Sequence, residues 1–216
     1  MNGRVLFPPI VRNLLIANIA IYLLQAAGGL SLLAEFALWP LGTPEYVLTQ
    51  QGPLAVPQFH PWQLLSYAFL HANFTHLFLN LFAIWMFGTR MEQVWGPARF
   101  AVYYLVCIVG AGLTQLLVLS PLLNPEGLSI NPTVGASGGV FGILLAFGMR
   151  FPEERLLLLF PPIPVKAKYF VIGYGALELL FGVTGTLSGV AHFAHLGGML
   201  FGGLLMLYWR RQQHHR

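Results

Sequence analysis

Six stretches of mostly apolar residues occupy most of this chain and constrain its fold more than any other feature. The stretches lie at about 11–33, 72–89, 98–119, 136–150, 167–185 and 189–209. A helix needs roughly 20 mostly apolar residues to cross a bilayer, so these lengths favour membrane spans. Only 8% of the residues are charged, against about 25% in a soluble domain. The sequence therefore predicts an all-α polytopic membrane protein with six transmembrane helices, the fourth short and glycine-rich.

The spans leave little sequence outside them, so we expect a single domain over residues 1–216. Its core covers about 10–209, with short tails at 1–10 and 210–216. The longest connection, 34–71, contains five prolines and no lysine or arginine. Proline disfavours another span, whereas leucine, phenylalanine and tryptophan disfavour a fully solvated loop. We expect this loop to be folded and to lie partly in the membrane interface.

The positive charges predict the orientation. With six spans, every lysine and arginine falls on one side of the membrane, at positions 4, 12, 90, 99, 150, 155, 166, 168, 210, 211 and 216. Positive loops stay in the cytoplasm, so both termini are expected to be cytoplasmic. The net charge of +4 thus reflects topology, and no nucleic-acid partner is expected. The lone cysteine, Cys107, excludes an intramolecular disulfide.

Ionisable and strongly polar side chains inside spans are costly and are candidates for function. Five stand out: Ser137, His76, Asn80, His195 and Glu178. At a rise of 1.5 Å per residue, Ser137 and His195 lie about 10 Å below the outer surface of the hydrocarbon core. His76 and Asn80 lie about 6 and 12 Å deep and share one helix face, being four residues apart. Four side chains from three helices are therefore predicted at one level.

Small residues provide a way for two of these helices to meet. In the sixth span, His195 shares its face with Gly198 and Gly202, which form a G-x-x-x-G pattern. In the fourth span, Gly138 and Gly142 are also four residues apart. Such faces allow close approach of helix backbones. If the two faces meet, the serine and the histidine come within hydrogen-bonding reach.

Other interpretations of the same residues remain open. The glycines of 135–142 could serve helix packing alone. The string also fits the G-x-S-x-G elbow, but that motif needs a preceding strand, and a loop rich in asparagine and proline precedes it here. Glu178 could orient His195 as a third catalytic member. The favoured interpretation is a structural role, with the carboxyl group protonated or hydrogen-bonded to a neighbouring helix.

The histidines raise the possibility of a metal site. His71, His76, His192 and His195 all lie in or near spans, and His71 and His192 are expected to be structural. The sequence has no H-E-x-x-H motif, and no carboxylate stands at ligand spacing to these histidines. We therefore expect no metal.

Three motifs together resemble a known family. The second span carries 71-HANFTHLFLN-80, the fourth begins with Gly135-x-Ser137, and the sixth carries 194-AHLGGMLFG-202. In this order and in these spans, the chain resembles the rhomboid intramembrane serine proteases, over about residues 10–209. The resemblance implies a six-helix rhomboid-like bundle that cleaves transmembrane segments of other proteins near their extracytoplasmic end. It also leans towards the bacterial cytoplasmic membrane as the location.

The resemblance implies a role for each site residue. Ser137 is the expected nucleophile and His195 the general base of a dyad, so no orienting acid is assigned. The oxyanion is expected to meet the Ser137 backbone N–H and the His76 and Asn80 side chains. Phe141 stands where many members have a tyrosine packed on the histidine. Supporting packing is expected from Gly135, Phe141, Gly198 and Gly202. No cofactor is implied, and the expected partners are transmembrane substrates and the lipid bilayer.

The sequence departs from the family at one loop position and leaves two other functions open. The first loop reads Trp62-Gln63, where the family often has tryptophan and arginine, which puts the rigidity of the loop in doubt. A non-catalytic binder or chaperone of transmembrane helices would use the same scaffold. A proton or solute transporter is disfavoured, because paired broken helices are not evident.

Overall fold

Helices form most of the chain in the computed structural model, which describes residues 6–28, 30–120, 130–157, 162–186 and 190–214. Of the predicted tails at 1–10 and 210–216, residues 1–5 and 215–216 lie outside this part. The α-helices are α1 (Pro9–Gly28), α2 (Leu30–Phe36), α3 (Gln63–Ser66), α4 (Phe74–Ala83), α5 (Thr89–Trp95), α6 (Pro97–Leu119), α7 (Ser137–Arg150), α8 (Ala167–Thr184) and α9 (His192–His214). A 3₁₀-helix, η1 (Tyr67–Phe69), follows α3, and a π-helix, η2 (Ile84–Gly88), joins α4 to α5.

Each of the six predicted spans overlaps a helix, although the boundaries differ. The first ends at Gly28 rather than at residue 33, and a separate helix, α2, follows it. The last continues to His214, through the start of the predicted tail. In the described residues, α1, α6 and α8 are long and apolar enough to cross a membrane, and α7 is a shorter apolar helix of 14 residues. The count of six spans stays a prediction.

A glycine–proline pair separates α5 from α6. Gly96 has a φ of 80°, a conformation that costs other residues energy, and its N–H donates to the Glu92 carbonyl oxygen at 2.8 Å. Pro97 then begins α6, where its missing N–H leaves no helical hydrogen bond unmade. The chain therefore reverses sharply and lays α6 beside the preceding helix.

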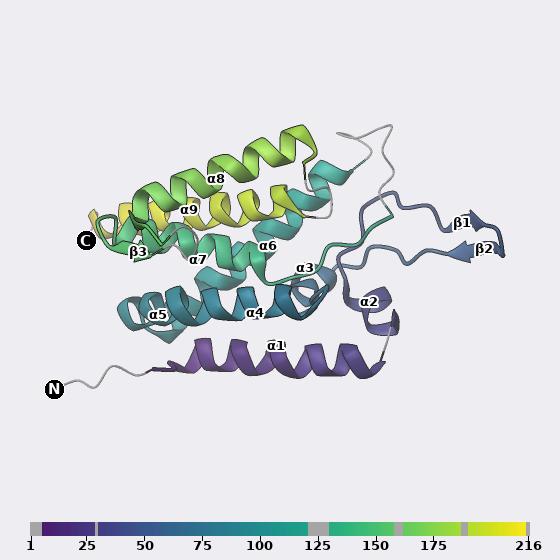
Figure 1. The fold of residues 1–216 in the computed structure, drawn as a ribbon, viewed down its shortest axis with the longest axis horizontal. Coiled ribbons are helices and arrows are strands. Elements are labelled where there is room, and N and C mark those ends of the chain that lie inside the picture. Colours follow the sequence, from purple (N-terminus) through teal and green to yellow (C-terminus); the bar gives the residue numbers. More distant parts are fainter. Residues whose placement is uncertain (1–5, 29, 121–129, 158–161, 187–189, 215–216) are drawn as a thin grey trace.

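The central helix α6 packs against α7 and α9, while α1 and α8 lie on opposite sides of this group (Figure 1). The buried core contains Tyr103, Tyr104, Phe100 and Ile108 of α6 together with Ile143 of α7. By contrast, α1 and α8 expose large apolar side chains. Their most exposed members include Leu23, Leu24, Ile172 and Val183. In a bilayer these faces would lie against lipid, where exposure of apolar surface carries no penalty.

The two ends of the helical group differ in charge. The start of α1, the α5–α6 junction, the end of α7, the start of α8 and the end of α9 lie at one end of the molecule (Figure 1). The described lysines and arginines all lie in these segments, in α5 or in the connection between α7 and α8. The hairpin formed by β1 (Tyr46–Thr49) and β2 (Gly52–Ala55) projects from the opposite end (Figure 1). This separation agrees with the predicted orientation, and the cytoplasmic assignment of the charged end stays a prediction.

Two short hairpins modify the all-α prediction. Strands β1 and β2 pair antiparallel within the 34–71 loop, and β3 (Arg155–Leu157) pairs antiparallel with β4 (Pro164–Lys166) between α7 and α8. Each strand has only three or four residues, which is too short for an alternating pattern to be recognised in the sequence. The described chain is thus mostly helical, with β-structure confined to its loops.

Gln63 anchors the first loop, where the family pattern suggested an arginine. Its side chain is fully buried, and its Oε1 accepts from the Trp39 N–H at 3.2 Å. Its Nε2 donates to the carbonyl oxygens of Glu35 and Gln58, both at 3.2 Å. One amide therefore connects three parts of the loop, so the doubt about loop rigidity is not supported by the contacts.

A buried carboxylate fixes α1 to α5. Glu92 is 2% exposed, and its two oxygens accept from the N–H groups of Ile10 at 2.9 Å and Val11 at 2.8 Å. These N–H groups belong to the first turn of α1, where a helix has no internal acceptors and carries partial positive charge. Glu92 thus acts as a cap supplied by another helix.

We expect Glu92→Gln to lower the free energy of unfolding by roughly 2 kcal/mol, because one charged acceptor is lost and an amide NH₂ then faces a donor. Thermal unfolding of the purified protein in detergent measures this change. Glu45→Gln, at an exposed loop carboxylate, is the matched control and should leave the midpoint unchanged. Equal midpoints for both variants would contradict the capping role.

Candidate active site

The turn before α7 explains the glycine that precedes the candidate serine. Gly135 has a φ of 125°, and its N–H donates to the Tyr67 carbonyl oxygen at 2.9 Å. Two residues earlier, Thr133 and Leu38 exchange backbone hydrogen bonds. A Cβ at position 135 would lie 2.6 Å from His76 Cε1. Only glycine satisfies both this backbone conformation and this contact, so the tethered turn delivers Ser137 to the start of α7.

The other glycines let three helices approach closely. A Cβ on Gly198 of α9 would overlap the backbone carbonyl of Gly138 in α7. Gly138 and Gly139 themselves pack against Ala111 and Tyr104 of α6. Further contacts of this kind occur at Gly142 with Cys107, and at Gly202 with Tyr103 and Cys107. The predicted meeting of the two glycine faces therefore exists in the structure, and its centre is the Gly138–Gly198 contact.

This contact brings the candidate serine and histidine together. Ser137 Oγ lies 2.8 Å from His195 Nε2, although the residues are 58 positions apart. The imidazole stacks on the Phe141 ring, with centroids 4.2 Å apart and planes 6° from parallel. Phe141 also stacks on Tyr174 of α8 at 5.3 Å. His195 is buried and Ser137 half-buried, so the pair is held on one side by packing and is partly open on another.

Glu178 of α8 makes a contact that the dyad interpretation does not include. Its Oε2 lies 2.9 Å from His195 Nδ1 and 2.7 Å from His192 Nδ1. This contact is a hydrogen bond between Glu178 and a neighbouring helix, as the structural interpretation expected. Its partner, however, is His195, the candidate general base. His192, expected only to be structural, shares the same carboxylate.

The structure brings together three possible metal ligands that are not at ligand spacing in the sequence. The ligand atoms of Glu178, His192 and His195 lie within 4.8 Å of one another, a grouping that could hold a metal ion. The carboxylate comes from a different helix, so no sequence spacing reveals it. All three groups already engage one another in the hydrogen bonds described above.

The two predicted oxyanion residues lie on α4. The Asn73 side chain accepts from the His76 N–H at 2.9 Å and caps the start of this helix. The His76 ring lies against Gly135, as described above, and edge-on to His71 at 5.1 Å. Asn80 is buried, and its Nδ2 donates to the His76 carbonyl oxygen at 2.9 Å. His71 is fully buried.

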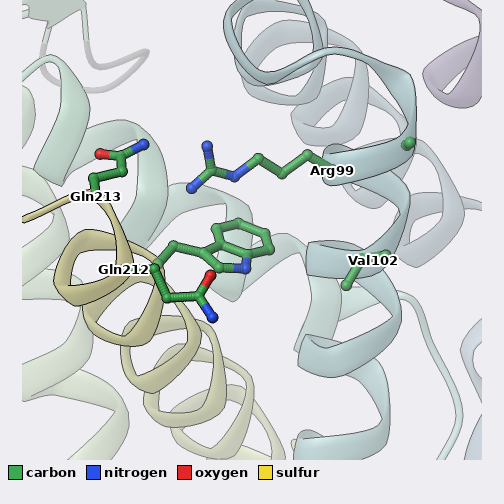
Figure 2. A pocket seen from close by; sticks show the side chains of 6 residues that line it. Arg99, Val102, Gln212 and Gln213 are labelled. Carbon is green, nitrogen blue, oxygen red and sulfur yellow. The ribbon is translucent and has the colours of Figure 1, made fainter. Parts of the chain in front are cut away.

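A separate pocket lies at the other ends of α6 and α9 (Figure 2). Arg99 and Val102 of α6 and Gln212 and Gln213 of α9 line it, and the Arg99 guanidinium lies 4.1 Å from the centroid of the Trp209 ring. Trp209 is 14 residues along α9 from His195, about 21 Å at the helical rise. The pocket therefore does not belong to the serine–histidine site.

Comparison with known proteins identifies the family. A Rhomboid domain matches residues 58–212, which include α3 to α8 and nearly all of α9. The chain belongs to the rhomboid family. Membership of this family and the long apolar helices together indicate that the chain is an integral membrane protein.

Several relatives carry rhomboid names. The chain is 31% identical to RHOMBOID-like protein 2 of Arabidopsis thaliana, over 79% of this chain and 52% of the relative. It is 29% identical to Rhomboid protein 1, mitochondrial, of Saccharomyces cerevisiae, over 81% and 50%. It is 28% identical to Rhomboid protease AarA of Providencia stuartii, over 90% and 70%. The chain spans about half the length of most of these relatives, which include mitochondrial and bacterial proteins, so the comparisons do not select one membrane.

We expect Gly198→Ala to destabilise this rhomboid protein by about 1–3 kcal/mol or more, because the new methyl group forces α9 away from the α7 backbone. Gly173→Ala is the matched control. Gly173 lies on exposed α8, and nothing is within 4 Å of a Cβ built there. Thermal unfolding in detergent should show a lower midpoint for Gly198→Ala and no decrease for Gly173→Ala. A wild-type midpoint for Gly198→Ala would contradict the close contact of α7 and α9.

Proposed function

We propose that this rhomboid protein is an intramembrane serine endopeptidase that cleaves transmembrane segments of other membrane proteins near their extracytoplasmic end. The observation that carries the proposal is the 2.8 Å contact between Ser137 Oγ and His195 Nε2. A serine hydroxyl is a weak nucleophile until an adjacent base accepts its proton. Polar side chains between apolar membrane helices are energetically costly, and such residues are therefore candidates for function.

The proposed reaction proceeds through an acyl-enzyme. His195 Nε2 accepts the Ser137 proton while Oγ attacks the scissile carbonyl carbon, which gives a tetrahedral intermediate. The intermediate collapses as the imidazolium gives the proton to the departing amine, and Ser137 remains acylated. A water molecule, deprotonated by His195, then hydrolyses the ester and regenerates the serine. The stack on Phe141 holds the imidazole plane in the orientation that both transfers need.

The oxyanion would form beside the start of α7. The first N–H groups of a helix have no internal acceptors and carry partial positive charge, which suits the Ser137 backbone N–H to this role. The contact of the His76 ring with Gly135 supports its assignment as a second donor. Asn80 lies one turn further along the same helix face.

Ser137→Ala and His195→Ala should each abolish cleavage of a model transmembrane substrate by the protein purified in detergent, because the nucleophile or its base is lost. Ser31→Ala and His60→Ala, which change a serine and a histidine exposed outside the site, are the matched controls and should cleave as the wild type does. Cleavage by Ser137→Ala at the wild-type rate would remove the protease proposal. Binding of the substrate by all variants without cleavage by any would favour a helix-binding or chaperone function instead.

We expect Asn80→Ala to lower kcat by about 100- to 1000-fold if its amide turns towards the oxyanion. Asn18→Ala is a close control, because the Asn18 amide also donates to the carbonyl four residues earlier, at 2.8 Å, but on α1. Steady-state cleavage kinetics measure both variants. Similar kcat values for the two variants would show that Asn80 is only a helix-stabilising residue.

A further inference from the structure

One carboxylate oxygen of Glu178 joins two histidines of α9 to α8. Oε2 lies 2.7 Å from His192 Nδ1 and 2.9 Å from His195 Nδ1, and all three residues are at most 9% exposed. The second nitrogen of His192, Nε2, lies 3.0 Å from the Thr186 carbonyl oxygen. The second nitrogen of His195 faces Ser137.

The partners of these nitrogens limit where the protons can be. A backbone carbonyl only accepts, so His192 Nε2 donates to Thr186. An ionised carboxylate oxygen accepts from both ring nitrogens, whereas a protonated one would donate to one nitrogen and accept from the other. With the carboxylate ionised, His192 donates from both nitrogens and is an imidazolium. His195 is then neutral and donates from Nδ1 to the same oxygen.

This arrangement leaves His195 Nε2 unprotonated and directed at the Ser137 hydroxyl, which is the tautomer a general base requires. When His195 accepts the serine proton, its new positive charge develops next to Glu178. A carboxylate that orients an imidazole and stabilises the imidazolium need not itself be protonated. The His192 charge neutralises Glu178 in the resting state, which lowers the cost of burying the carboxylate.

We propose that Glu178, paired with His192, is a positioning residue that fixes the His195 tautomer and stabilises its protonated form during acylation. The proposal rests on the proposed protease function and extends the expected dyad to a serine–histidine–carboxylate relay. Glu178 contacts the His195 nitrogen that faces away from Ser137, so its effect passes through His195.

The test compares kinetics of Glu178→Gln with the wild type and Ser137→Ala in the full chain, using a model transmembrane substrate in detergent. Glutamine keeps an acceptor of similar length but no charge. We expect kcat to fall at least about tenfold, because the imidazolium loses its counter-ion. KM should stay within about twofold, because the lost stabilisation is that of the His195 imidazolium, which forms only after the substrate is bound.

Glu92→Gln is the control for a carboxylate that is buried but purely structural. It should lower the unfolding midpoint and leave kcat unchanged, whereas Glu178→Gln should lower kcat. A wild-type kcat for Glu178→Gln, with Ser137→Ala inactive, would overturn the positioning role and leave the protease function standing. Equal activity of Ser137→Ala and wild type would overturn the protease function itself. Loss of wild-type activity on adding a chelator would also overturn the relay, in favour of a metal held by the three side chains.

A measurement on the wild type keeps the proposal testable if Glu178→Gln fails to fold. In protein labelled with ¹⁵N-histidine, ring ¹⁵N shifts at neutral pH distinguish the two tautomers from the imidazolium. Spectra of His192→Ala and His195→Ala assign the signals by difference. We expect His195 to be protonated at Nδ1 alone and His192 at both nitrogens. Protonation of His195 at Nε2 would contradict the proposal.

Discussion

The close contact between α7 and α9 is the interaction on which the rest of the structure depends. At Gly138 and Gly198 the two backbones approach so closely that a methyl group would not fit. In a bilayer, apolar side chains gain little from leaving lipid, so helix association depends on such backbone proximity and on buried hydrogen bonds. The glycines that weaken helix propensity here thus stabilise the tertiary structure.

The same contact sets the geometry of the candidate site. His195 lies three residues before Gly198, and Ser137 directly precedes Gly138, so the helix spacing also sets the distance between imidazole and hydroxyl. The surrounding elements then restrict each partner separately. The tethered turn at Gly135 sets the start of α7, while Phe141 and Glu178 hold the imidazole from its face and its far edge.

The sequence predicted the parts of this site that follow helical periodicity. Ser137, His195 and the two glycine faces were found because each face repeats along one helix and the depths agree. The Glu178–His192 pair was not assigned, because its members come from different helices and their meeting depends on how α8 packs on α9. Gln63 was misjudged for a similar reason, since its anchoring contacts are to backbone carbonyls that no sequence pattern specifies. The short hairpins have too few residues for a recognisable period.

The central claim is that the α7–α9 contact makes Ser137 an activated nucleophile. Treating the protein in detergent with a fluorophosphonate and mapping the adduct by peptide mass spectrometry tests this most directly, because the reagent phosphonylates serines that an adjacent base has activated. The account predicts one adduct, on Ser137, that disappears in His195→Ala. An adduct on another serine, or equal labelling of Ser137 without the histidine, would contradict it.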